Sequence, residues 1–354
     1  MKQGLLRAKM RVKRQVIRAT GFNPKKIVSI VRKEKTPSIQ CEILKCYSTP
    51  TMLEIFDPRS QRVRGHYFQE RNAYLLKDVI LEPKQGLVFS KLGELIEEST
   101  SWPPTFLYNS FPWNPQRHIP RLRVPTAIFL PGTAFGHWLM EDLPLFITAL
   151  ELSPSAPILI PKSHPKFIAD LVKSLDREVI YINGPVRVDS LILIQKNLDS
   201  GWPHPKDIEV LNHFPTFVEA KFKHAPSTRV YASRRGNKRS PENESQIEVL
   251  FEEFGFKVFQ LEKLNLFEEI GLLSSTSVLA GFHGSAHTNV VWMPSGGSVL
   301  DIVNENYWTE AGHRLAFLKN CSYDSQVYKG SMNEVVSMSE IKDYLTKSYK
   351  LTLG

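Results

Sequence analysis

Short apolar runs alternate with helical segments along most of the chain from residue 126 onward. The first series, TAIFLPG, APILIP, EVIYIN and SLILIQ, lies between residues 126 and 195. A second series begins at TRVYASRR, and its expected strands are 228–235, 257–261, 277–282, 298–303 and 325–328. Apolar strands that alternate with helices predict mostly parallel sheets covered on both faces. We therefore expect an α/β protein with two such units in tandem.

The segments between the strands carry helix signals. Helices are expected at 136–150, 164–175, 206–222, 241–254, 265–274, 286–293, 309–319 and 339–348. Pro144 predicts a kink in the first of them. Ser240 and Pro241 predict an N-cap and a first helical residue, and Gly255 stands where that helix should end.

The length of 354 residues predicts two domains, because it is large for one core. Gly201, Pro203 and Pro205 mark a linker between the two series of strands, and a hinge is expected near 200–226. Residues 36 to about 125 show short strands, turns and many prolines. The expected organisation is an arm at 1–35, an α/β domain with an irregular β-containing start at 36–205, a second α/β domain at 206–338 and a final helix at 339–354.

Positive charge is concentrated at the N-terminus. Residues 1–35 hold twelve Lys or Arg and one acid, a net charge of +11, whereas the whole chain carries +9, so residues 36–354 sum to −2. Apolar residues lie between these charges, which suits contact with an anionic membrane surface. Binding to nucleic-acid phosphates and a solvated arm are the alternatives. Because the remainder is near neutral, a dedicated nucleic-acid-binding protein is not expected.

Composition argues against several other classes of protein. A hydrophobic content of 42% and a charged content of 23% are ordinary for a soluble globular protein. No apolar run is long enough to span a membrane, and the N-terminus lacks the apolar core of a signal peptide. Cys41, Cys46 and Cys321 show neither zinc spacing nor a disulfide framework. A cytoplasmic protein is expected, with the arm as a peripheral attachment to the inner face of the membrane.

The stretch AGFHGSAHTNVVWMP leads directly from an apolar strand into an expected helix. A helix N-terminus at the carboxyl edge of a parallel sheet presents unpaired N–H groups to an anion such as phosphate. The candidate phosphate ligands are His283, Gly284, Ser285, Ala286 and His287. An ordinary tight turn is the alternative. Zinc binding by the two histidines is a weaker one, because no third ligand lies nearby in the sequence.

A second anion-suited stretch, YASRRGNKRSPENE, follows another strand of the same unit. It holds Arg234, Arg235, Lys238 and Arg239. Guanidinium groups suit a diphosphate because they donate two hydrogen bonds at once. A solvated charged loop is the alternative.

The stretch FGHWLMEDLPLF lies in the first unit. On a helix, His137 and Glu141 share one face and Asp142 lies on the adjacent one. A histidine beside carboxylates can act as a general base, although early acids also stabilise a helix N-terminus without any catalytic role. Asp301 ends a strand after the phosphate-type helix, where acids often bind a ribose.

These stretches together resemble the family-61 glycosyltransferases, over about residues 126–330. The resemblance rests on FGHWLMEDLPLF and on residues 231–302, with their Ser-Arg, Asn-Glu, His-Gly and Thr-Asn motifs in order. The sequence departs from the family's usual residues at Ala286 (Gly), His287 (Leu), Asp301 (Glu) and Leu145 (Arg).

The resemblance implies a GT-B-like fold, in which two Rossmann-like units face a cleft, and inverting transfer without a metal. The absence of any Asp-x-Asp motif agrees with that. A nucleoside diphosphate sugar would be the co-substrate and a glycan or lipid-linked glycan the acceptor, as in surface or capsular polysaccharide biosynthesis. No other cofactor is expected.

Each candidate residue then has an expected role. Arg234 and Arg239 brace the diphosphate on the helix near Gly284, and Asp301 and Asn289 bind the nucleoside. Glu141 is the first candidate for the base and Asp142 the second, while His137 orients the carboxylate or replaces it. A non-catalytic protein that binds nucleotide sugars or anionic glycans is the alternative, and nucleic-acid binding through the arm is a third reading.

Overall fold

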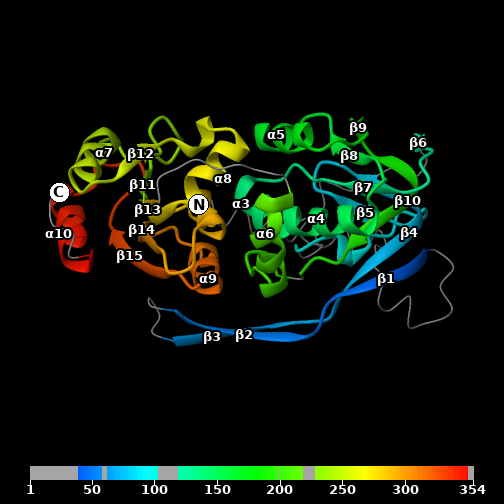
Figure 1. Cartoon of the computed structure of the whole chain (residues 1–354), viewed down its shortest axis with the longest axis horizontal. Helices are drawn as coiled ribbons and strands as arrows, with labels where there is room; N and C mark the ends of the chain where they lie inside the picture. Colours follow the sequence, from blue (N-terminus) through cyan, green and yellow to red (C-terminus); the bar gives the residue numbers. More distant parts are fainter. Residues whose placement is uncertain (1–38, 58–61, 103–118, 198, 218–227, 350–354) are drawn as a thin grey trace, which may run out of the picture.

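The computed structural model describes residues 39–57, 62–102, 119–197, 199–217 and 228–349. The basic arm at 1–35 lies outside the described residues. The described chain forms two sheets with helices around them and a long hairpin that runs beside both (Figure 1). The protein is thus a mixed α/β protein. None of its described helices is both long and apolar enough for a membrane span.

The N-terminal sheet has eight strands and is mixed. Its order is β1 (Gln40–Ser48), β4 (Arg71–Glu82), β10 (Val186–Ile194), β7 (Ala127–Phe129), β8 (Ile158–Pro161) and β9 (Val179–Ile182), with β5 (Leu87–Phe89) on β4 and β6 (Arg121–Leu122) on β10. The path from β10 to β9 is parallel, as the alternation predicts. Strands β1 and β4 are antiparallel. The β-containing start of the chain therefore extends the same sheet, and the expectation of a mostly parallel sheet holds only for the part after residue 126.

The C-terminal sheet is parallel throughout. Its order is β12 (Lys257–Phe259), β11 (Thr228–Ala232), β13 (Thr276–Phe282), β14 (Ser298–Asn304) and β15 (Ser322–Tyr328). The chain leaves β11 toward one edge, forms β12, and returns to place β13 on the other side of β11. In open α/β sheets, ligands bind at the carboxyl ends of the strands where the order reverses in this way. The topology therefore directs attention to the ends of β11 and β13.

The helices around this sheet follow the predicted positions with two differences. They are α7 (Glu244–Glu253), α8 (Leu266–Ser274), η6 (Ser285–Trp292), α9 (Ala311–Leu318) and α10 (Met338–Tyr349). Helix α7 begins after Asn243, not after Ser240; the Asn243 side chain bonds both backbone groups of Val336 and so fixes the segment before α10. The segment after β13 is a 3₁₀-helix.

The first helical segment of the N-terminal unit changes geometry along its length. A short turn, α3 (Phe135–His137), continues as a π-helix, η4 (Trp138–Asp142), and then as α4 (Leu143–Leu152). The N–H of Leu143 bonds the carbonyl of Trp138, five residues back. Pro144 has no N–H to give to the preceding turn, so the predicted kink takes the form of a π-bulge, a feature common at functional sites.

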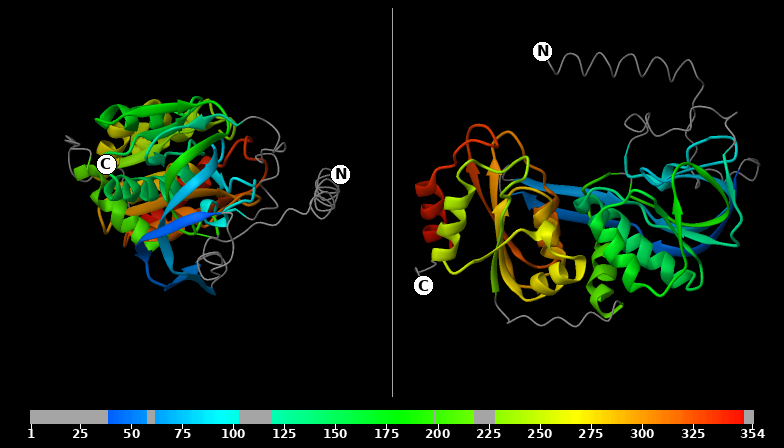
Figure 2. Two further views of the ribbon diagram at one scale, coloured as in Figure 1. Left: turned by 90° about the vertical axis from the view of Figure 1, so that its right-hand side faces the viewer. Right: turned by 90° about the horizontal axis from the view of Figure 1, so that it is seen from above.

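A shared apolar core and a β-hairpin connect the two units. The helices α5 (Lys166–Ser174) and α6 (Pro205–Phe217) complete the N-terminal unit, and one cluster of buried apolar residues runs from α4 and α6 into η6 and α9. The hairpin of β2 (Thr51–Asp57) and β3 (Arg62–Phe68) lies along one side of the molecule and reaches both units (Figures 1 and 2). Its buried residues pack with Trp202 of the N-terminal unit and Leu318 of α9.

Candidate active site

The two anion-suited loops meet at the carboxyl edge of the C-terminal sheet. Strand β11 leads into Arg234, and β13 leads into His283 and Gly284. A Cβ atom at Gly284 would collide with the guanidinium group of Arg234. Only glycine allows the arginine to lie this close to the start of η6. Loops that are about 50 residues apart in the sequence therefore form one surface.

The arginines of this surface have no carboxylate partner. Neither Arg234 nor Arg239 forms an ion pair within the described chain, whereas Arg235 pairs with Glu248 at 3.4 Å. Burial and the neighbouring Arg239 lower the pKa of Arg234. The Arg239 guanidinium lies 4.6 Å from the centre of the Tyr307 ring. The nearby Glu244 acts on the Arg234 pKa in the opposite direction, but its carboxylate already accepts the Tyr231 hydroxyl and the Arg234 backbone N–H. Two adjacent cations that are not ion-paired favour an anionic ligand.

The start of η6 adds backbone donors beside the arginines. Within the described residues, the N–H groups of Gly284, Ser285 and Ala286 bond no acceptor, whereas the N–H of His287 bonds the Gly284 carbonyl at 3.1 Å. Unpaired N–H groups at a helix start carry partial positive charge. Together with Arg234 and Arg239 they form what we call the cationic cluster.

His283 lies beside this cluster, but its ring nitrogens are already used. Its Nε2 accepts the N–H of Thr309 at 3.0 Å, so Nδ1 carries the proton and donates to Asp301 at 2.6 Å. The Tyr323 hydroxyl donates to the same carboxylate oxygen at 2.5 Å. The side chain of His283 thus holds the loop in place, and the expected hydrogen bond to a phosphate does not fit this arrangement.

Asp301 and His287 lie behind the cluster. Asp301 is fully buried. Burial opposes its ionisation, but contacts from His287, His283 and Tyr323 outweigh it and lower its pKa. The His287 side chain is also buried, and its Nε2 lies 3.4 Å from the Leu300 carbonyl oxygen. Burial lowers the pKa of this histidine. Neither position suits a direct contact with the donor, because the protein interior surrounds both side chains.

His137 and Glu141 form a pair on the N-terminal side of the site. His137 Nδ1 lies 3.0 Å from Glu141 Oε1, and this carboxylate also accepts from Ser200 Oγ at 2.7 Å and from the Gly201 N–H at 2.9 Å. The hydrogen bond to Glu141 raises the pKa of His137. The imidazole is 41% exposed, against 10% for the carboxylate. The exposed base of the pair is therefore the histidine, and the glutamate lies behind it.

Asp142 points away from this pair. Its carboxylate accepts from Thr133 and from Lys196, both at 2.5 Å, and its side chain is 1% exposed. Burial raises its pKa, against the effect of Lys196. It lines a small cavity of about 50 Å³ under α4 in the N-terminal unit. Asp142, the second candidate for the base, is thus one half of a buried ion pair with Lys196.

The two sides of the site are in contact. A Cβ atom on Gly136 would lie 3.4 Å from Ser285 Cβ and 3.3 Å from Thr288 Cγ2, so His137 follows directly after the point where α3 meets η6. Across the same boundary, Arg314 of α9 donates to the Gly201 carbonyl at 2.8 Å and covers the Trp202 ring at 3.4 Å. The loop that binds Glu141 is therefore held by the C-terminal unit.

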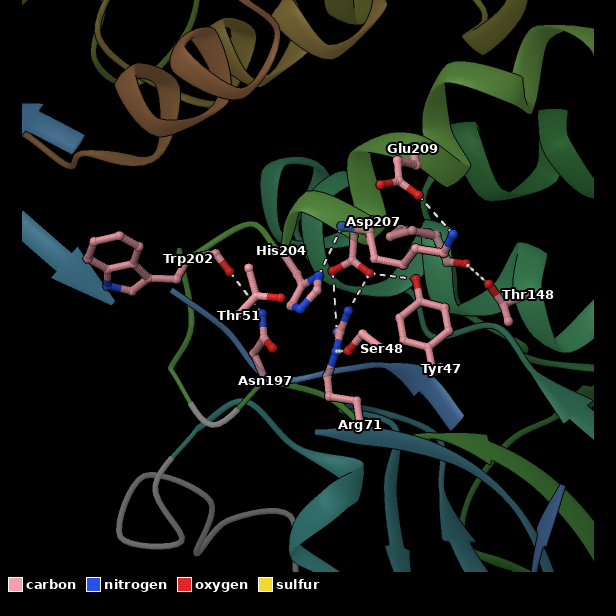
Figure 3. A network of polar contacts seen from close by, with 12 residues as sticks. Tyr47, Ser48, Thr51, Arg71, Thr148, Asn197, Trp202, His204, Asp207 and Glu209 are labelled. Atoms are coloured by element: carbon pink, nitrogen blue, oxygen red, sulfur yellow. Dashed lines mark hydrogen bonds and ion pairs between the residues drawn. The ribbon is translucent and has the colours of Figure 1, made fainter. Parts of the chain in front are cut away.

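The base of that loop is fixed by a buried polar network that the sequence alone does not reveal (Figure 3). Arg71 pairs with Asp207 at 2.8 Å, and the Tyr47 hydroxyl donates to the same carboxylate at 2.6 Å. Asn197 donates to the Trp202 carbonyl at 3.0 Å. In the sequence, this network is signalled only by Arg71 at the start of an apolar strand. Its partner, Asp207, lies 136 residues further along the chain.

Asn289 lies further along η6, fully buried, and donates to Glu269 at 2.7 Å. Burial raises the pKa of Glu269 to about 7. No group of three His, Cys, Asp or Glu side chains that could hold a metal ion occurs in the described parts of the chain. His283 and His287 therefore have no third ligand for zinc among these residues.

Comparison with known protein families gives a match for the middle of the chain. No curated protein matches the chain. Residues 135–300 match the family model described as Glycosyltransferase 61. The matched region begins at α3, next to the His137–Glu141 pair, and includes both loops of the cationic cluster. Residues 135–300 therefore form a domain of the family-61 glycosyltransferases, which supports glycosyltransferase activity.

Proposed function

We propose that the protein transfers a sugar from a nucleoside diphosphate sugar to a glycan acceptor, with inversion and without a metal, in a GT-B-like arrangement of its two units. One observation supports this most. A histidine with a 41% exposed side chain, hydrogen-bonded to a carboxylate, lies on the N-terminal side, beside a cationic cluster on the C-terminal side whose arginines are not ion-paired in the described chain.

The cationic cluster suits the leaving group. When the bond between the anomeric carbon and the diphosphate oxygen breaks, negative charge grows on the diphosphate. Arg234, Arg239 and the N–H groups from Gly284 to Ala286, which bond no acceptor in the described chain, would stabilise such a charge. His283, fixed by Asp301, holds the backbone at Thr309 beside the cluster. Asp301 is therefore proposed as a positioning residue.

The His137–Glu141 pair suits the acceptor. His137 Nε2 has no hydrogen-bond partner in the described chain and takes the proton of the acceptor hydroxyl as its oxygen attacks the anomeric carbon. The new bond forms opposite the leaving diphosphate, which inverts the configuration. Glu141 holds the ring through Nδ1 and stabilises the imidazolium that forms. Asp142 has no place in this step, because Lys196 neutralises it.

The location of the enzyme is also a proposal. The net charge of +11 in residues 1–35 supports peripheral attachment to an anionic cytoplasmic membrane surface, where lipid-linked glycans of capsular type would be acceptors. Sedimentation of the full chain with phosphatidylserine vesicles tests it. Binding should occur at low salt and fall at high salt, and a lack of binding at low salt would exclude attachment through this charge.

The central experiment uses the full chain, a panel of nucleoside diphosphate sugars and a panel of glycan acceptors, with and without EDTA. The expected result is release of nucleoside diphosphate at an unchanged rate in EDTA, with a product of inverted anomeric configuration by NMR. Retained configuration, or activity that requires added manganese or magnesium, would overturn the mechanism. Donor binding without turnover on any acceptor would favour the non-catalytic binding protein.

A further inference from the structure

A second cavity opens beside the cationic cluster, between the two units. It has a volume of about 210 Å³ and lies between α5 on one side and η5 (Leu261–Lys263), α8 and η6 on the other. We call it the interunit cavity. Ser285 and Ala286 line it, and the same two residues contribute N–H groups to the cationic cluster. A ligand whose phosphates lie on the cluster can therefore continue into the cavity.

An acid lies at the mouth of the cavity. The cavity lies beyond the carboxyl end of β12, the strand next to β11 on the side away from β13. Glu262 follows β12 by three residues, lines the cavity and lies on the same side of the sheet as the loop after β11 that carries Arg234. A carboxylate can accept hydrogen bonds from the two ribose hydroxyls.

The lining also suits a flat heterocycle. Phe135 and Phe167 are half-buried at its wall, with ring centres 5.3 Å apart. At the inner end, the Oδ1 atom of Asn289 is buried and bonds nothing in the described structure, although Nδ2 of the same side chain donates to Glu269. An unpaired buried acceptor is costly, and the N–H of a nucleobase would satisfy it.

We propose that the interunit cavity binds the nucleoside of the donor, with the base between the phenylalanines and Asn289 and the ribose hydroxyls on Glu262. This assignment rests on the proposed function. It moves the ribose contact from Asp301, which is buried, to an exposed acid at the cavity. Asn237 of the arginine loop donates to Glu262 Oε1 at 2.9 Å, which ties the ribose contact to the diphosphate contact.

Leu264→Trp tests the cavity, because this half-buried residue lines it and a larger side chain would fill it. Calorimetry on the full chain should measure UDP, ADP, GDP, CDP and inorganic pyrophosphate. We expect the variant to lose more than about tenfold in affinity for the best-bound nucleoside diphosphate and to keep its pyrophosphate affinity. Val249→Trp, at a position 54% exposed on α7, is the matched control and should change neither.

Glu262→Gln provides a second test that does not depend on packing, since this side chain is exposed. It should weaken the affinity for the ribonucleoside diphosphate by about three- to tenfold. The affinity for the 2′,3′-dideoxy analogue of the same nucleotide should stay unchanged. Unaltered nucleoside diphosphate affinity in both variants would overturn the cavity assignment while pyrophosphate binding still supports the cationic cluster. If the wild-type chain binds neither pyrophosphate nor any nucleoside diphosphate, the proposed function itself fails.

Discussion

The two sides of the candidate site treat charge in opposite ways. On the C-terminal side, Arg234 and Arg239 lie together and form no ion pair in the described chain. On the N-terminal side both candidate acids are paired, Glu141 with His137 and Asp142 with Lys196. In the proposed mechanism, the first side binds the charge of the donor diphosphate. On the second side the acids are neutralised by neighbouring cations, and the partly exposed imidazole of His137 is the group proposed to accept a proton.

The largest effect is expected at His137. His137→Ala should reduce turnover by about 10²–10⁴-fold, because it removes the proposed general base, and should leave donor affinity unchanged. Turnover and calorimetric affinity are measured on the same preparation. The control is His213→Ala, an exposed histidine on α6. Normal turnover in His137→Ala would contradict the proposal that His137 is the general base, because the exposed imidazole would then have no part in the chemistry.

The next effect tests the unpaired arginines. Arg239→Ala should weaken nucleoside diphosphate and pyrophosphate alike by about 10–100-fold, the scale of hydrogen bonds to charged groups. Arg235→Ala should change either affinity less than about twofold, because Arg235 is exposed and already pairs with Glu248. Equal losses of affinity in Arg239→Ala and Arg235→Ala would show that the net positive charge of the loop decides binding and that the missing ion pair of Arg239 does not.

Glu141→Gln should reduce turnover by about tenfold and also move the pH profile. The hydrogen bond to Glu141 raises the pKa of His137, so the wild-type enzyme loses activity as the pH falls through that raised value. Glutamine removes the negative charge and should shift the acidic limb of kcat/KM to lower pH. A limb that stays in place, or moves upward, would remove Glu141 as the partner of the base.

The smallest effect should come from Arg314, which belongs to the C-terminal unit but holds the loop beside Glu141. Arg314→Lys should lower kcat by about three- to tenfold without changing donor affinity, because lysine loses the planar fork that bonds Gly201 and stacks on Trp202. Arg64→Ala is the control, since Arg64 pairs with Glu310, the same acid that pairs with Arg314. An identical fall in both variants would assign Arg314 a general structural role.

Several features of the site could be predicted from local sequence. Apolar runs and helix spacing fixed the order of strands and helices, and the turns after β11 and β13 identified Arg234, Arg239 and Gly284. The two loops meet, as the sequence predicts, because a parallel sheet brings the carboxyl ends of its strands to one edge. Helix ends were less certain, because Asn243 takes its partner from Val336, far along the chain.

Sequence alone did not decide which acid faces the site. Glu141 and Asp142 are adjacent in the π-helix that precedes Pro144, and they face different surroundings because Ser200 bonds the first and Lys196 the second. Asp301 similarly ends its strand as expected but is enclosed by His283 and Tyr323. The type of a residue and its place on an element follow from local sequence. Its burial, and so its pKa and its access to a ligand, depend on side chains that only the folded chain brings near.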